Sequence, residues 1–146
     1  MLYQASLPQP FEELDHPADL RIRVRGASAA QTLARLVLAH AALLSGGAPV
    51  TSMRQHEITV AGADGLVWVA LDVLRELHRC FCLEREIVCR VGVESFSSAG
   101  ARLVVDVGAY DPSLHVEGHD IKAVTYHAAR FEAAGDGYVG EVVFDI

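Results

Sequence analysis

The chain has 146 residues and a formal net charge of −7, because 12 Lys and Arg stand against 19 Asp and Glu. Apolar residues make up 51% of it, which excludes a disordered chain and fits a single domain over residues 1–146. The negative charge argues against a protein that binds nucleic acid by itself, since phosphate binding depends on Lys and Arg. No apolar run reaches the roughly 18 residues of a membrane span, and no secretory signal is visible, so we expect a cytoplasmic protein without membrane contact.

The first regular elements are predicted between residues 20 and 60, after a loosely ordered segment over residues 1–10. Residues Leu20–Arg25 alternate apolar and cationic side chains, which indicates a half-buried strand with one arginine face. Ser28 and Gln31 have the spacing of a capping box, and the following apolar residues recur at helical spacing, so we predict a helix over residues 28–44. Gly46 and its neighbours end that helix, and a strand is predicted over residues 53–60.

The second half of the chain contains one helix and two hairpins. A broad apolar face predicts a helix that begins near residue 64 or 65 and includes Phe81. Residues 86–96 and 101–109 flank a turn, as do residues 121–133 and 137–144, and each pair predicts an antiparallel hairpin. Two helices among mostly antiparallel strands predict the α+β class, as a single layered domain with the helices packed on one face of the sheet.

Three cysteines, Cys80, Cys82 and Cys89, lie in one short stretch after His78. Zinc ligation is one interpretation, but structural zinc sites usually separate paired cysteines by two to four residues, and Cys-x-Cys on a helix directs its thiols apart. An odd number of cysteines also argues against a disulfide framework. We therefore expect buried free thiols.

Two acidic segments could hold a cation. Residues Asp15–Asp19 place two carboxylates and an imidazole on a proline turn, where they could ligate a metal or simply fix the turn. An apolar strand over residues 142–146 would bring the α-carboxylate of Ile146 beside Asp145. Carboxylate oxygens are the hard ligands that calcium and magnesium select. The alternative is a strand whose end happens to be acidic.

Two cationic features also stand out. Lys122, within residues 121–127, is the only lysine in the chain. A compact ammonium suits a site that binds one oxygen or loses a proton, although chance can leave one lysine in an arginine-rich chain. Arg21, Arg23 and Arg25 share one strand face, where they could contact RNA, meet an acidic partner or remain solvated.

The motifs of common enzyme classes are absent from the sequence. It has no nucleophile elbow, phosphate loop, His-Glu-x-x-His or dinucleotide fingerprint, so we expect a protein that is not an enzyme. One alternative is a small metal-dependent hydrolase that uses Asp19 and Asp145 to activate water. Another is a binding module that needs no metal.

Three segments together resemble the archease family: residues Asp15–Asp19, Ile121–His127 and Val143–Ile146. Their order and spacing fit, so the resemblance covers nearly the whole chain from Phe11 onward. The family implies a non-catalytic cytosolic protein that assists an RtcB-type RNA ligase in tRNA splicing and RNA repair, by promoting its guanylylation and repeated turnover. Some members are linked to a tRNA methyltransferase as chaperone-like modulators, and contact with RNA is expected to be indirect or weak.

The resemblance also implies a divalent-cation site. In the family, the aspartate that ends the first motif and the terminal Asp-Ile pair hold the ion. These positions correspond to Asp19, Asp145 and the backbone carboxylate of Ile146. Calcium is the ion expected in crystals, with magnesium or manganese as alternatives in cells. The residues expected to support the site are Lys122, Asp15 and His16.

Overall fold

Helix α1, over Ala29–Ser45, lies at the centre of the fold. The computed structural model describes residues 3–14, 19–62 and 64–146. The predicted cap is present, because Ser28 Oγ accepts a hydrogen bond from the Gln31 N–H at 3.1 Å. The helix ends at Gly46, whose φ of 66° is a left-handed geometry that glycine adopts without strain. The predicted start and stop signals are both confirmed.

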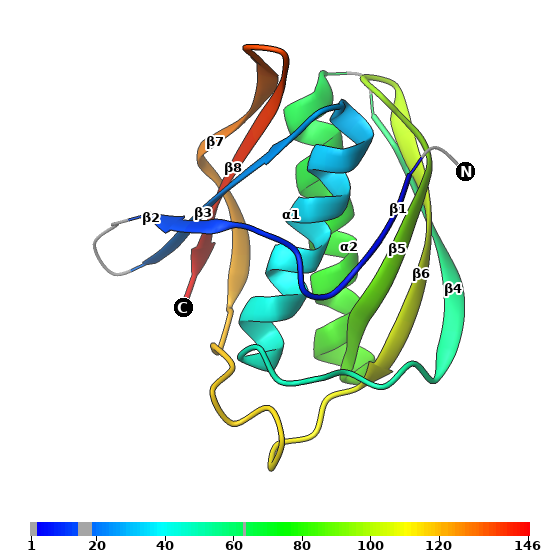
Figure 1. Cartoon of the computed structure of the whole chain (residues 1–146), viewed down its shortest axis with the longest axis vertical. Helices are drawn as coiled ribbons and strands as arrows, with labels where there is room; N and C mark the ends of the chain where they lie inside the picture. The colour runs from blue at the N-terminus through cyan, green and yellow to red at the C-terminus, as the bar shows by residue number, and fades with distance from the viewer. Residues whose placement is uncertain (1–2, 15–18, 63) are drawn as a thin grey trace.

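Leucines on different sides of α1 are fully or almost fully buried: Leu33, Leu36, Leu38 and Leu43. A helix with buried apolar residues on more than one side must be covered on more than one side. Accordingly α1 and the second helix, α2 (Leu66–Glu84), lie between two four-stranded sheets (Figure 1). The predicted α+β class with antiparallel strands is confirmed, and the structure adds that the strands divide into two sheets, so both faces of the helix layer are covered.

The first sheet includes a strand that the sequence did not predict. Its strands, in order across the sheet, are β1 (Tyr3–Ser6), β5 (Glu86–Ser97), β6 (Gly100–Ala109) and β4 (Arg54–Ala61). Residues 1–10 were expected to be loosely ordered, yet residues 3–6 pair antiparallel with β5. The reason is that Tyr3, Ala5 and Leu7 alternate toward the core and pack against it.

The second sheet brings residues 12–14 and 19–26 beside the C-terminal hairpin. Its strands, in order, are β2 (Glu12–Leu14), β3 (Asp19–Gly26), β8 (Gly137–Asp145) and β7 (Ala123–Ala134). Strand β8 pairs antiparallel with both β3 and β7, so it lies in the interior of the sheet. The predicted hairpins, β5–β6 and β7–β8, are both confirmed.

Strand β7 contains a wide bulge. Its register with β8 shifts between Thr125 and Arg130, and Ala128 has a φ of 56°. Val124 is buried, and Tyr126, two residues later, is 51% exposed. Tyr126 stacks on Trp68 of α2, with ring centroids 4.1 Å apart. The irregularity therefore begins after Thr125 and adds unpaired residues to one strand.

The segment over residues 110–122 crosses from the first sheet to the second and is fixed to the end of α1. The His119 N–H donates to the carbonyl of Leu43 at 2.8 Å. His115 is buried; its Nδ1 accepts from the Asp111 N–H and its Nε2 donates to the Pro49 carbonyl, each at 2.9 Å. These bonds set the position at which the chain enters β7. No helix in the described ranges is long and apolar enough to cross a membrane.

A double-mutant cycle can test how α1 docks on the second sheet. A Cβ added at Gly140 would lie 3.0 Å from Leu36 Cδ1. We expect Gly140→Ala to lower the free energy of unfolding by about 1–3 kcal/mol through overpacking, and Leu36→Ala to lower it by about 2–5 kcal/mol through a cavity. The double variant should lose less than the sum, because the new methyl group occupies part of that cavity.

Urea unfolding of the four proteins measures this coupling. The control cycle combines Gly140→Ala with Leu103→Ala, since Leu103 is fully buried but belongs to β6 of the other sheet. That pair should be additive within about 0.5 kcal/mol. Additivity of Gly140→Ala with Leu36→Ala would show that α1 does not dock on β8 as described.

Candidate functional site

The predicted cation ligands meet at one end of the second sheet. Asp19, the first residue of β3, is directly opposite Asp145, the last residue of β8. Directly opposite residues of an antiparallel pair point to the same face, with Cβ atoms about 4.5–5.5 Å apart. The two carboxylates therefore share one face of the sheet, at the end where the C-terminus lies in Figure 1.

Lys122 is attached to the same place through its backbone. Its N–H donates to the Asp145 carbonyl at 2.7 Å, and Asp145 is also opposite Ala123, the first residue of β7. The start of the motif over residues 121–127 therefore lies beside Asp145, the predicted C-terminal ligand. Ile146 follows β8 and is 44% exposed. Asp15 and His16, the other supporting residues, lie outside the described residues.

The donor set suits a hard cation. Two carboxylates on one face supply anionic oxygen ligands, which calcium and magnesium prefer. Within the described ranges, no group of three or more His, Cys, Asp or Glu side chains gathers as a metal site. The third protein ligand expected from the resemblance is the backbone carboxylate of Ile146, which follows Asp145. Magnesium in particular usually keeps several of its waters.

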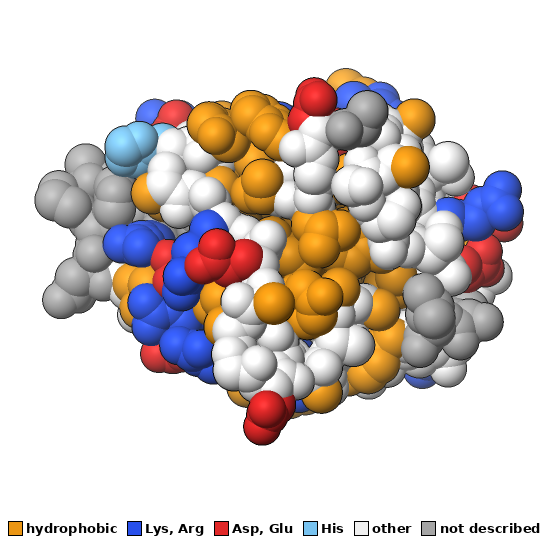
Figure 2. All heavy atoms as spheres, turned by 90° about the horizontal axis from the view of Figure 1, so that it is seen from above, with side chains coloured by type: hydrophobic (Ala, Val, Ile, Leu, Met, Phe, Trp, Pro, Cys, Tyr) orange, Lys and Arg blue, Asp and Glu red, His pale blue; other side chains and the backbone are white. Residues whose placement is uncertain are grey.

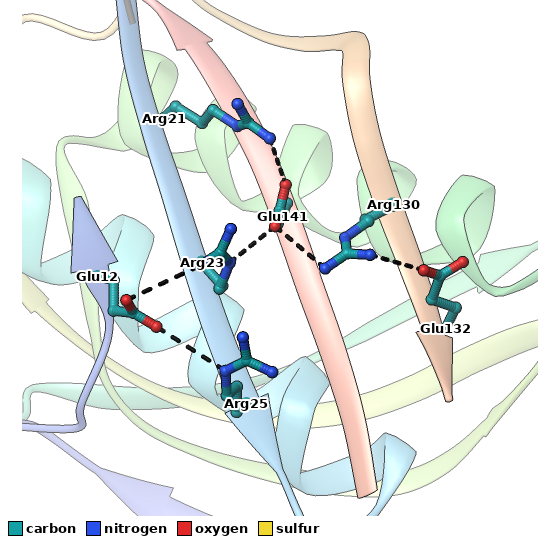
Figure 3. A network of polar contacts seen from close by, with 7 residues as sticks. All are labelled: Glu12, Arg21, Arg23, Arg25, Arg130, Glu132 and Glu141. Atoms are coloured by element: carbon teal, nitrogen blue, oxygen red, sulfur yellow. Dashed lines mark hydrogen bonds and ion pairs between the residues drawn. The ribbon is translucent and has the colours of Figure 1, made fainter. Parts of the chain in front are cut away.

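The arginine face predicted on β3 is occupied by carboxylates of the chain itself (Figure 3). Glu141 of β8 lies opposite Arg23, and its side chain is only 3% exposed. Arg21 Nη2 donates to Glu141 Oε2 at 2.6 Å, and Arg23 Nε donates to Glu141 Oε1 at 2.8 Å. Arg130 of β7 approaches Oε1 at 3.3 Å from the other side. The interpretation of a merely solvated face is therefore wrong for Arg21 and Arg23.

Sequence reasoning missed Glu141 and Arg130 as members of this network. The available signal was a single charged residue in an otherwise uncharged stretch, Tyr138–Phe144. The pKa of Glu141 is lowered overall: burial opposes ionisation, but the hydrogen bonds from Arg21 and Arg23 and the charge of Arg130 outweigh it. Glu141 is therefore ionised at neutral pH and holds arginines of two strands in fixed positions.

The three cysteines form no common site. Cys80 and Cys89 are half-buried, and Cys82 is exposed. Cys82 Sγ lies 3.5 Å from His78 Nε2, whereas Cys89 donates to the Asp106 carbonyl at 3.4 Å. Burial raises the pKa of the Cys80 and Cys89 thiols, which keeps them protonated at neutral pH. They are free thiols, as expected, but less buried than expected.

Removing the central carboxylate should destabilise the fold. We expect Glu141→Gln to lower the free energy of unfolding by about 3 kcal/mol, the low end for a broken buried pair because its arginines are partly exposed. Glu132→Gln is the matched control, because Glu132 also pairs with Arg130 but is 56% exposed. It should change stability by less than about 1 kcal/mol. Equal effects of the two variants in urea unfolding would contradict a central role for Glu141.

The same pair of proteins gives a pH test. The pKa of Glu141 is lower in the folded chain than the roughly 4.3 of an unfolded glutamate, so its ionised form stabilises the fold above that value. This stabilisation is lost as the pH falls through the folded pKa. The stability difference between the wild type and Glu141→Gln should therefore be constant near neutrality and shrink below about pH 4. If the stability difference grew on acidification, the pKa of Glu141 would be raised by folding and not lowered.

Sequence comparisons place the chain among known proteins. The profile of the Archease protein family matches residues 11–146. The curated protein archease of Methanopyrus kandleri is 29% identical over 140 residues, which cover 94% of this chain and 99% of that protein. The protein archease of Methanosarcina acetivorans is 25% identical over 140 residues, with 93% and 95% covered.

Solved structures share the fold. The solution structure of protein 1598 of Methanobacterium thermoautotrophicum has a TM-score of 0.69 at 20% identity, and covers 93% of this chain and 98% of its own. The crystal structure of an archease described as a possible chaperone, from Thermotoga maritima, has a TM-score of 0.59 at 17% identity, with 97% and 99% covered. These identities establish the fold alone, but the family profile spans nearly all of the sequence. The chain belongs to the archease family.

Proposed function

We propose that this protein activates an RtcB-type RNA ligase in tRNA splicing and RNA repair, by promoting its guanylylation and repeated turnover without catalysing ligation itself. The proposal is supported by family membership and by one observation in particular, the register that sets Asp19 opposite Asp145. Both positions were expected from the resemblance to hold a divalent cation. The fold brings them to one face of one sheet end.

Each residue of this site has a distinct task in the proposal. Asp19 and Asp145 provide two carboxylates, and the backbone carboxylate of Ile146 provides a third oxygen ligand. The hydrogen bond from the Lys122 N–H fixes the backbone of Asp145. When bound, a divalent cation would supply a positive centre with open positions for oxygen ligands of the ligase or its nucleotide. The ammonium of Lys122 would offset the remaining negative charge.

The alternative function is that of a chaperone-like modulator of a tRNA methyltransferase. The description of the Thermotoga maritima relative as a possible chaperone supports the chaperone-like part of this alternative. A metal-dependent hydrolase has weaker support. Hydrolysis would need a general base beside the ion, and in the described part of the chain no third His, Cys, Asp or Glu side chain joins Asp19 and Asp145. The activator is therefore the function that the site supports best.

The first test is the substitution Asp145→Asn. It keeps the size of the side chain but removes a charge, so we expect manganese or calcium binding to weaken at least about tenfold. Guanylylation of a cognate ligase with GTP over repeated turnovers should fall to the rate without this protein. Asp136→Asn, in the exposed β7–β8 turn, removes the same charge from the same hairpin and should leave both measurements unchanged. Full stimulation by a folded Asp145→Asn protein would exclude the cation site as the basis of activation.

The second test separates the terminal carboxylate of Ile146 from the side chain of the same residue. Deletion of Ile146 should abolish cation binding, because the terminal carboxylate then lies one residue earlier. Ile146→Ala should bind the ion normally, because it keeps that carboxylate. Strand β8 ends at Asp145, so both proteins should fold. Calorimetric titration with manganese measures the affinity of each variant. Equal affinities of the deletion variant and Ile146→Ala would rule out the terminal carboxylate as a ligand.

A further inference from the structure

Strand β2 leaves part of the edge of β3 unpaired. It is only three residues long, and its register with β3 ends at the pair Glu12 and Arg23. The preceding residue, Phe11, lies outside the strand, so the backbone of Arg25 has no strand partner on that side. Arg35 of α1 takes this place, because its Nη1 donates to the Arg25 carbonyl at 2.6 Å.

A hollow of about 190 Å³ lies where the pairing ends. Phe11 and Glu12 line it on one side, Arg23 and Arg25 line it from β3, and Arg35 lines it from α1. Figure 2 shows Lys and Arg side chains gathered on the left of the molecule, the side on which Figure 1 draws the second sheet. Three arginines and one glutamate therefore line this small volume.

The donors in this hollow are incompletely used. Arg35 Nε is buried and has no hydrogen-bond partner among the described residues. The contacts of Glu12 with Arg25 Nε and Arg23 Nη1 measure 3.9 Å and 4.0 Å, which are too long for hydrogen bonds. A buried N–H without a partner is rare in folded proteins. Outside the hollow, the same state occurs at Arg21 Nε, His56 Nε2 and Arg130 Nε. The guanidinium of Arg35 is meanwhile held in place by its bond to the Arg25 carbonyl.

We propose that this hollow binds a phosphate group. Guanidinium groups donate in a planar fork that matches the oxygens of a phosphate, and several of them can share one tetrahedral anion. Arg25 and Arg35 bind the anion directly, and Arg23 contributes its Nη1 while its Nε stays on Glu141. The phosphate belongs either to a nucleotide or to a single-stranded RNA. The site is separate from the cation ligands and does not depend on the proposed activity.

Arginine side-chain NMR tests the site directly. The protein, labelled with ¹⁵N at arginine and kept in EDTA, is titrated separately with inorganic phosphate, GMP and a short uridine oligonucleotide. The Nε–Hε signals of Arg25 and Arg35 should shift and saturate, whereas the signal of Arg102, exposed on β6 of the other sheet, should not. Tightest binding of GMP identifies a nucleotide phosphate, and tightest binding of the oligonucleotide identifies an RNA phosphate. Either result supports the site.

Three variants complete the test: two remove one positive charge each, and one removes a negative charge. Arg35→Gln should weaken binding about tenfold, the effect of losing one charge-assisted hydrogen bond. Glu12→Gln should strengthen binding severalfold, because it removes the competing carboxylate, and Arg102→Gln should have no effect. Should Arg35→Gln fail to fold, Arg25→Gln replaces it, since the Arg25 side chain is 58% exposed.

The proposal is overturned if none of the three ligands shifts the Arg25 and Arg35 signals. It is also overturned if Arg102→Gln weakens binding as much as Arg35→Gln, because the attraction is then general. Phosphate binding in Asp145→Asn should equal that of the wild type. The cation site and the phosphate site can therefore fail independently.

Discussion

The pairing of β3 with β8 is the constraint that positions both the two aspartates at the sheet end and the arginine network around Glu141. One register sets Asp19 opposite Asp145 and Arg23 opposite Glu141. A slip of one residue would turn every side chain of a strand to the other face. The register is enforced from inside, because the opposing pairs Leu20 with Phe144 and Ile22 with Val142 face the helices, and Ile22 and Phe144 are fully buried. Apolar packing on one face therefore fixes the polar geometry on the other.

This arrangement holds like charges together. Two carboxylates directly opposite each other in a sheet repel, so Asp19 and Asp145 oppose the pairing that the buried residues impose. Next along the same face, Arg21 lies opposite the neutral Val143 and directs its guanidinium to Glu141. A divalent cation, bound as proposed above, would offset the repulsion between the two aspartates.

Local signals in the sequence were sufficient to predict most helices and strands, but not to predict which strands lie side by side. The alternation of Leu20–Arg25 predicted the buried and polar faces of β3, and Ser28 predicted the start of α1. The same patterns could not show that Glu141 lies beside Arg23, since pairing of distant strands depends on the whole core. The signal for a second sheet was the presence of apolar residues on more than one side of α1. The juxtaposition of Asp19 with Asp145 was expected from the family resemblance and not from spacing.

The charge distribution sets which phosphates the outer face of the second sheet can select. The chain carries a net charge of −7, so a long polyanion is repelled by the molecule as a whole. A guanidinium group acts over shorter distances, because charges are screened within about 8 Å at physiological ionic strength. Arg23, held by Glu141, and Arg35, held by the Arg25 carbonyl, also lose little side-chain entropy when they bind. Long-range repulsion and short-range attraction together favour one phosphate group over a long RNA bound along its length. Such a phosphate would be brought near the hollow by a second contact of the molecule that carries it.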